Sequence, residues 1–207
     1  IGLAGAICLI VTTIEHWRYR PPAAQTDERS RLVDLTAERE RFLGAGRGGH
    51  LARLPFNEQF SLEVHERTYS LPRLPSGWDG VTLVHLSDVH FRGVVSERYF
   101  QRVMEEVARL EPEGILFTGD LLDRRDCLSW IPRTFGRLSA PLGCLFILGN
   151  HDWYVGCERQ IRETLTACGW TDVGGRALDL TRGGDAITIC GNERPWLGRP
   201  PDLAQVP

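Results

Sequence analysis

Short apolar runs alternate with amphipathic segments from residue 81 to residue 191, and this alternation constrains the fold more than any other feature. Two segments, 97–110 and 157–168, carry apolar residues at helical spacing, and 127–138 predicts a shorter helix that Pro132 interrupts. Four runs have the length and composition of buried strands: 81–87, 115–118, 144–148 and 186–191. Strands and helices in this order predict an α/β fold built in layers around a largely parallel sheet.

Side chains that can bind a metal ion follow each of the first three predicted strands. Asp88 and His90 follow the first strand, Asp120 the second and Asn150 the third. Any one of them alone is more often a turn residue or a helix cap than a ligand. Three such strand ends in succession are hard to obtain from turn chemistry, and functional side chains emerge at the carboxyl ends of parallel strands. The sequence therefore predicts a metal site at that edge of the sheet.

Three motifs at these strand ends resemble a known family: D-V-H at 88–90, G-D-L-L-D-R at 119–124 and G-N-H-D at 149–152. Together they resemble the first three blocks of the calcineurin-like metallophosphoesterase superfamily. The resemblance covers about residues 60–207. Within it, the segment 71–91, which follows an N-terminal apolar segment, is similar to the membrane-anchored bacterial members, which resemble phosphodiesterases. The resemblance implies a metallophosphoesterase-type sandwich of mixed β-sheets flanked by helices.

The resemblance also implies a metal-binding role for four of these residues. Two divalent ions would clamp a phosphate ester and turn a bridging water into a hydroxide nucleophile. Asp88 and His90 would hold the first ion, Asn150 would hold the second, and Asp120 would bridge both. Carboxylate, imidazole and carboxamide ligands suit borderline divalent ions, so we expect Mn²⁺, Fe²⁺ or Zn²⁺.

Three further residues of the motifs receive roles in handling the substrate. His151 resembles the family's general acid for the leaving oxygen, and Asp123 would orient its imidazole. Arg124 occupies the place of a phosphate-binding arginine, for which a bidentate guanidinium is well suited. A surface salt bridge is an equally good interpretation of Arg124.

The sequence departs from the family pattern after the third motif. The superfamily completes its metal site with a lone histidine and then G-H-x-H, whereas no histidine follows His151 in this sequence. The sequence begins with Ile1 and ends at Pro207, near the point where the second half of the sandwich should begin. We therefore expect it to be the N-terminal portion of a longer domain, truncated at the C-terminus and catalytically poor as written.

The first 59 residues divide into two regions before the domain. Residues 1–14 carry no charge, and 14 helical residues rise about 21 Å, short of the roughly 30 Å hydrocarbon core. We interpret 1–20 as a single membrane anchor, part of a transmembrane helix, with a secretory signal or a buried helix as alternatives. Arg18 and Arg20 after this run favour a cytoplasmic catalytic domain.

Between the anchor and the domain, residues 21–59 are interpreted as a linker or stalk. Within it, the densely charged segment 27–43 is typical of an exposed helix or stalk. The domain itself, 60–207, opens with an extended strand over 60–71.

Composition excludes several other functions. All 24 basic residues are arginines, which excludes chemistry that needs a lysine amine. The net charge of −3 argues against a nucleic-acid partner, whose binding proteins present a strongly basic face. The six cysteines form no C-x-x-C pair, so we expect reduced structural thiols and no disulfide framework.

These observations lead to one functional hypothesis and one alternative. The hypothesis is a membrane-associated, metal-dependent phosphoesterase that hydrolyses a phosphodiester or phosphomonoester, and a lipid-linked ester would suit an anchored site. The alternative is a non-catalytic, membrane-tethered module with an incomplete metal site. Trp153 and Tyr154, next to the third motif, are candidates either for packing or for the substrate mouth.

Overall fold

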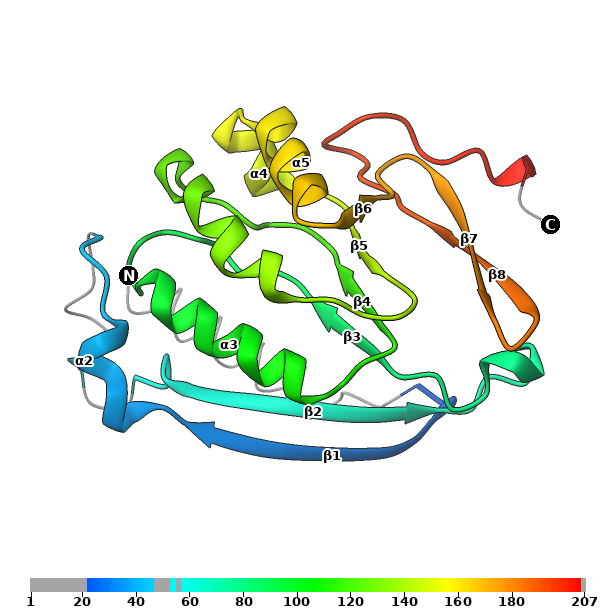
Figure 1. Ribbon diagram of the computed structural model, residues 1–207, viewed down its shortest axis with the longest axis horizontal. Helices are drawn as coiled ribbons and strands as arrows, with labels where there is room; N and C mark the ends of the chain where they lie inside the picture. The colour runs from blue at the N-terminus through cyan, green and yellow to red at the C-terminus, as the bar shows by residue number, and fades with distance from the viewer. Residues whose placement is uncertain (1–21, 47–52, 55–56, 206–207) are drawn as a thin grey trace, which may run out of the picture. The chain divides into compact units, whose positions relative to one another are not determined.

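The computed structural model describes residues 22–46, 53–54 and 57–205 (Figure 1). The chain forms two compact units, one containing the chain up to Val33 together with Glu63–Arg73, the other containing Asp34–Leu62 and Leu74–Pro207. The anchor interpreted at 1–20 lies outside the described residues. Within the described ranges, no helix combines the length and apolar character needed to cross a bilayer.

The first unit is built on a two-stranded sheet of β1 (Gln25–Asp34) and β2 (Ser61–Tyr69). Strand β2 confirms the predicted strand over 60–71. Strand β1 differs from the helix or stalk expected over 27–43, where only the short helices Thr36–Glu38 and α2 (Arg39–Phe42) are helical. Most side chains of β1 are exposed, so no apolar alternation marks it as a strand, and its partner lies far along the chain.

The second unit contains the predicted parallel sheet. Its four strands run in the order β3, β4, β5, β6, and every neighbouring pair is parallel. The first three strands confirm the prediction, but the fourth is Trp170–Asp172 rather than 186–191. The strand bounds are β3 (Leu83–Leu86), β4 (Gly114–Phe117), β5 (Cys144–Phe146) and β6 (Trp170–Asp172).

The run predicted as the fourth strand belongs to a separate hairpin. Strand β8 (Asp185–Cys190) pairs antiparallel with β7 (Ala177–Arg182), which the sequence analysis did not identify. Gly183 and Gly184 connect the two strands with φ angles of 60° and 90°. Such two-residue turns need positive φ, which glycine adopts without strain, so the chain reverses here instead of entering the parallel sheet.

Helices follow the strands as expected, although one region takes a tighter form. Helix α3 (Glu97–Arg109) and helix α5 (Glu158–Ala167) confirm two predicted helices, and α4 (Asn150–Val155) is a short helix after the third motif. The region of the interrupted helix forms 3-10 segments at Arg125–Arg133 and Phe135–Arg137. Further 3-10 turns lie at Ser76–Trp78 and Leu203–Gln205.

Apolar side chains cover the two faces of the parallel sheet differently. In Figure 1 the helices of the second unit lie on one side of the strands and the β7–β8 hairpin lies on the other. On the helical side, the ring of Phe135 packs against Phe117 of β4 at 4.9 Å and against Trp170 of β6 at 5.2 Å between centroids. Residues of both the sheet and the hairpin line a small apolar cavity, among them Leu83, Leu116, Leu145, Leu180, Ile187 and Ile189. The carboxyl ends of β3, β4 and β5 are thereby held at one edge.

Candidate metal centre

The loops after β3 and β4 hold three predicted ligands in an unusual backbone conformation. Asp88, His90 and Asp120 have φ angles of 55°, 47° and 58°, a region that residues with a side chain rarely adopt. Backbone hydrogen bonds join the loops, from Asp88 N to Gly119 O at 3.1 Å and from His90 N to Asp120 O at 2.9 Å. Such strain persists only where the surroundings hold it, and it concentrates at functional sites.

Two glycines let the loops after β4 and β5 approach each other closely. A Cβ at Gly119, whose φ is 102°, would collide with the backbone of Gly149. A Cβ at Gly149 would collide in turn with the carboxylate of Asp120. Both positions therefore require glycine, and Asn150, the first residue of α4, lies directly beside this contact.

A buried carboxylate, Asp152, fastens the same two loops together. Its Oδ2 accepts hydrogen bonds from the backbone N–H groups of Asp120 and Gly149, both at 3.0 Å. Its Oδ1 accepts from Leu121 at 2.9 Å and from Leu122 at 3.0 Å. Burial raises the pKa of Asp152 above its ordinary value, although the backbone donors oppose that rise. Asp152 is the last residue of the G-N-H-D motif, and that position is the sequence signal for it, although the motif alone predicted no role for this carboxylate.

Asp88, His90 and Asp120 form a group that can hold a metal ion. Each offers one ligand atom, and these atoms all lie within 4.8 Å of one another. His90 Nε2 lies 3.7 Å from Asp88 Oδ1, so this ring nitrogen faces the carboxylate with which it would share an ion. Two carboxylates and an imidazole are a donor set that suits borderline divalent ions.

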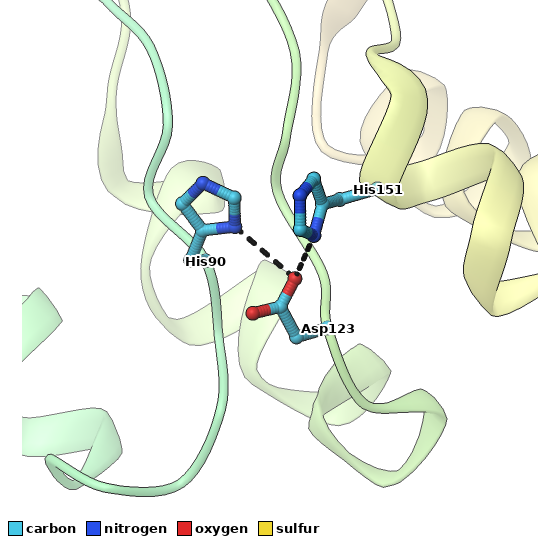
Figure 2. A group of neighbouring side chains, drawn as sticks. All are labelled: His90, Asp123 and His151. Carbon is cyan, nitrogen blue, oxygen red and sulfur yellow. Dashed lines mark hydrogen bonds and ion pairs between the residues drawn. The ribbon is translucent and has the colours of Figure 1, made fainter. Parts of the chain in front are cut away.

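The other nitrogen of His90 faces Asp123, which also binds His151 (Figure 2). Asp123 Oδ1 lies 3.1 Å from His90 Nδ1 and 2.6 Å from His151 Nδ1. An ionised carboxylate only accepts hydrogen bonds, so each Nδ1 carries a proton and each Nε2 is left for another partner. Histidine ligands of metals commonly donate their second N–H to a carboxylate in this way. His90, Asp123 and His151 also meet the distance criterion for a metal group, but these hydrogen bonds favour an orienting role for Asp123.

An arginine that the sequence analysis missed completes the surroundings of Asp123. Arg92 Nε forms an ion pair with Asp123 Oδ2. Burial alone would raise the pKa of Asp123, but the hydrogen bonds of His90, Arg92 and His151 outweigh burial and hold that pKa below its ordinary value. Asp123 is therefore a carboxylate throughout the neutral range. The signal for Arg92 was its position two residues after His90.

Arg124, the predicted phosphate-binding arginine, has a different partner in the structure. Its guanidinium pairs with the exposed Asp126 two residues away, with Nε 3.2 Å from Asp126 Oδ1. The structure thus brings together five predicted residues: Asp88, His90, Asp120, Asp123 and His151. It places Asn150 next to them through the Gly149 contact, whereas Arg124 is engaged in a surface ion pair.

A second buried carboxylate supports the loop after β5 from a distant part of the chain. Glu193 Oε1 accepts a hydrogen bond from Leu148 N at 2.6 Å, and Glu193 Oε2 lies 2.5 Å from Arg162 Nη2. Arg162 also binds Asp172 at 2.7 Å, which ties α5 and β6 to the same loop. No pattern near Glu193 in the sequence indicated this role, because all of its partners are distant along the chain.

With the site's geometry established, comparison with known proteins places the chain in a family. The sequence profile of the calcineurin-like phosphoesterases matches residues 81–192, which is more than half of the chain and contains all seven predicted site residues. The chain belongs to the calcineurin-like phosphoesterase family. Its parallel and antiparallel sheets with flanking helices agree with that family's fold, and the family's use of divalent metals agrees with the ligand groups found here.

Several curated metallophosphoesterases are similar to parts of this phosphoesterase chain. YkuE of Bacillus subtilis, described as an uncharacterized metallophosphoesterase, is 32% identical over 76% of the chain and 56% of its own length. The UDP-2,3-diacylglucosamine pyrophosphatase LpxG of Chlamydia muridarum is 28% identical over 48% of the chain and 31% of its own length.

A third relative is a vertebrate protein. A zebrafish (Danio rerio) transmembrane protein with a metallophosphoesterase domain is 35% identical over 47% of the chain and 22% of its own length. The chain thus spans about half the length of these curated relatives, or less. No solved structure matches the chain.

Proposed function

We propose that this chain belongs to a metal-dependent phosphoesterase that hydrolyses a phosphodiester or phosphomonoester, and that its strand-end residues are metal ligands. The single observation that supports this proposal most strongly is the convergence of Asp88, His90 and Asp120 within ligand distance, with Asp123 bound to the far side of His90. An orienting carboxylate on the far nitrogen of a histidine is a feature of metal sites rather than of turns.

In this proposal Asp88 and His90 would hold one divalent ion, Asn150 would hold a second, and Asp120 would bridge the two. The ion identity is proposed as Mn²⁺, Fe²⁺ or Zn²⁺ from the oxygen and nitrogen donors. When bound, such a pair polarises the phosphate and lowers the pKa of the attacking water. The Asp120 carboxylate also accepts a hydrogen bond from His151 N at 2.9 Å. The same residue is therefore a proposed metal ligand and a support for the backbone of the proposed acid.

His151 is proposed as the acid for the leaving group. For this step the imidazole of His151 must carry a proton on both nitrogens. Water supplies the oxygen that bonds to phosphorus and releases a proton to solvent, the ester P–O bond breaks, and the leaving oxygen takes the proton of His151 Nε2, which solvent then restores. Asp123 holds Nδ1 at 2.6 Å, which leaves Nε2 as the nitrogen that can reach the substrate. Arg124 would contact the phosphate only after leaving Asp126, and Arg92 is a second candidate cation at this edge.

The substrate is proposed to be a membrane-borne or lipid-linked phosphate ester, hydrolysed by a membrane-associated enzyme on the cytoplasmic side. Two observations support this part of the proposal. One relative is named as a pyrophosphatase of a diacylated sugar nucleotide, and another is named as a transmembrane protein. The uncharged run at 1–14 adds a sequence feature suited to a membrane.

Manganese binding tests the ligand assignment without requiring turnover. Mn²⁺ would be titrated into the protein and the free ion measured by electron paramagnetic resonance, for the parent, Asp120→Asn and the control Asp126→Asn. Asp126 is an exposed carboxylate paired with Arg124, outside the ligand group. We expect Asp120→Asn to weaken Mn²⁺ binding at least about tenfold and the control to match the parent. Equal binding by all three proteins would remove the basis of the proposed site.

Turnover then separates the enzyme from the non-catalytic module. The assay uses bis-p-nitrophenyl phosphate, Mn²⁺ and the protein with whatever residues its gene encodes on either side of this sequence. Mn²⁺-dependent hydrolysis that Asp120→Asn abolishes is the expected result. Tight Mn²⁺ binding without hydrolysis of this or any vesicle-borne phosphate ester would favour the tethered module instead.

A further inference from the structure

Three large aromatic side chains lie exposed beside the candidate acid. Trp153, Tyr154 and Trp196 are 43%, 60% and 43% exposed. Two other tryptophans of this unit behave differently: Trp78 and Trp170 are 1% exposed, and their indole N–H groups donate to the Asp185 and Phe135 carbonyls at 3.0 Å. Packing in the core therefore explains the buried pair, whereas packing among the described residues does not account for the exposed rings.

The exposed rings form one continuous patch that begins at the site. The ring of Tyr154 lies 5.9 Å from that of His151 between centroids. Trp153 lies 5.1 Å from Tyr154 and 5.8 Å from Trp196, which comes from the distant loop after β8. We call Trp153, Tyr154 and Trp196 the aromatic patch. Residues from two separate segments thus build it against the edge that carries His151.

The geometry of the aromatic patch is better suited to contact with an extended surface than to stacking around a planar group of a substrate. The rings are tilted against one another by 36° to 59° and already touch, so they leave no parallel slot in which a planar group of a substrate would be stacked. Tryptophan and tyrosine combine an apolar body with a polar tip, and for this reason they are enriched where a protein meets the lipid–water interface.

Charge around the aromatic patch points to the same partner. Arg194 and Arg199 are exposed and flank Trp196 in its loop. Exposed arginines beside interfacial aromatics attract anionic phospholipid headgroups.

We propose that the aromatic patch contacts the surface of an anionic phospholipid bilayer and holds the edge of the metal site at the level of the headgroups. The biological purpose of this contact rests on the proposed function, because a metal site held at the headgroups can reach phosphate esters of lipids. The contact itself needs neither a metal ion nor turnover.

Fluorescence quenching by brominated lipids tests the contact directly. The full chain would be mixed with phosphatidylcholine–phosphatidylglycerol vesicles whose acyl chains carry bromine, with EDTA present. The variant W153F/W196F keeps aromatic rings in the patch but removes its indoles. Its matched control is W130F, because Trp130 packs against Phe91 at 5.4 Å rather than in the patch. Trp17 is common to all of these proteins and supplies an equal background.

We expect the parent and W130F to be quenched on vesicle binding, and W153F/W196F to lose the quenching that exceeds the shared background of Trp17. Undiminished quenching of W153F/W196F would overturn the proposal, because the indoles that enter the bilayer would lie elsewhere. A second outcome would also overturn the proposal. If bis-p-nitrophenyl phosphate, in the absence of lipid, protected the fluorescence of Trp153 and Trp196 from quenching by acrylamide, the aromatic patch would be a substrate subsite. Because the measurement is made in EDTA, an inactive protein that is still quenched would refute the proposed function alone.

Discussion

The carboxylate of Asp123 lies 2.6 Å from Nδ1 of His151, and it fixes the ring of the candidate acid from behind. The same oxygen lies 3.1 Å from Nδ1 of His90, a predicted metal ligand. One carboxylate therefore couples the proton-transfer group to the metal group. A change at Asp123 should disturb both, which distinguishes it from a residue that supports only the fold.

We expect Asp123→Asn to lower kcat by about 10- to 100-fold while KM changes little, because the substitution disturbs the orientation of both imidazoles. Steady-state kinetics with a soluble phosphodiester would measure this, together with Mn²⁺ affinity for the effect on His90. Asp126→Asn is the matched control, since it removes a nearby exposed carboxylate outside the cluster. A kcat within about twofold of the parent would contradict the orienting role.

Arg92 and Arg124 should differ in their effect on pH dependence. Burial would raise the pKa of Asp123, and Arg92 is one of the groups that hold it low. In Arg92→Ala the pKa of Asp123 should therefore rise. Protonation of Asp123 then begins at higher pH, and the acidic limb of the pH–rate profile should shift to higher pH. Arg124→Ala should leave that limb in place, because Arg124 pairs with Asp126.

The two arginine variants also test the sequence prediction for Arg124. A raised KM for Arg124→Ala would support a contact with the substrate phosphate, and an unchanged KM would contradict that contact. An acidic limb that does not move in Arg92→Ala would contradict the role assigned to Arg92.

Asp152→Ala should destabilise the fold strongly. The carboxylate is fully buried and accepts four backbone hydrogen bonds, so the alanine variant leaves these donors without an acceptor. Each unsatisfied buried group costs about 1–3 kcal/mol, and we expect a total loss of at least about 3 kcal/mol in the free energy of unfolding. Urea denaturation followed by circular dichroism would measure it. Asp126→Ala serves as the exposed control, and a loss below about 1 kcal/mol for Asp152→Ala would refute the role.

The thiols of Cys127 and Cys144 should be unreactive in the folded protein. Burial raises the pKa of each to about 11, so at pH 8 only about one thiol in a thousand is the reactive thiolate. Iodoacetamide labelling at pH 8, read by mass spectrometry, should modify both residues only after denaturant is added. Rapid labelling of either thiol in the native protein would contradict the burial of both side chains.

Sequence patterns predicted the helices and strands that carry a recognisable apolar pattern within their own residues. Strands β3, β4 and β5 and helices α3 and α5 were predicted, because each carries an apolar run or stripe of the right period. The ligand types at the strand ends were predicted for the same reason, since each motif is contiguous. Strand β1 was not, because its exposed, charged residues show no alternation, and β7 was missed although its Gly-Gly turn was visible.

Residues that act through distant partners escaped prediction. Glu193 has no motif, and its importance comes from Leu148 and Arg162, which are brought to it by the packing of β5 and α5. Arg92 and Arg124 are both arginines close to the motifs, so composition and spacing treat them alike. Only the folded loops decide that the first pairs with Asp123 and the second with Asp126.

The sequence by itself determined the α/β alternation, the residues at the strand ends and the family, because these depend on the order of side chains along short segments. The tertiary structure decided which strand joins which sheet, which carboxylate binds which donor, and that three aromatic rings from two segments meet beside His151. Hydrogen-bond partners and surface patches depend on which distant segments pack together. The free energy of that packing comes from many contacts throughout the core, so no single stretch of sequence specifies it.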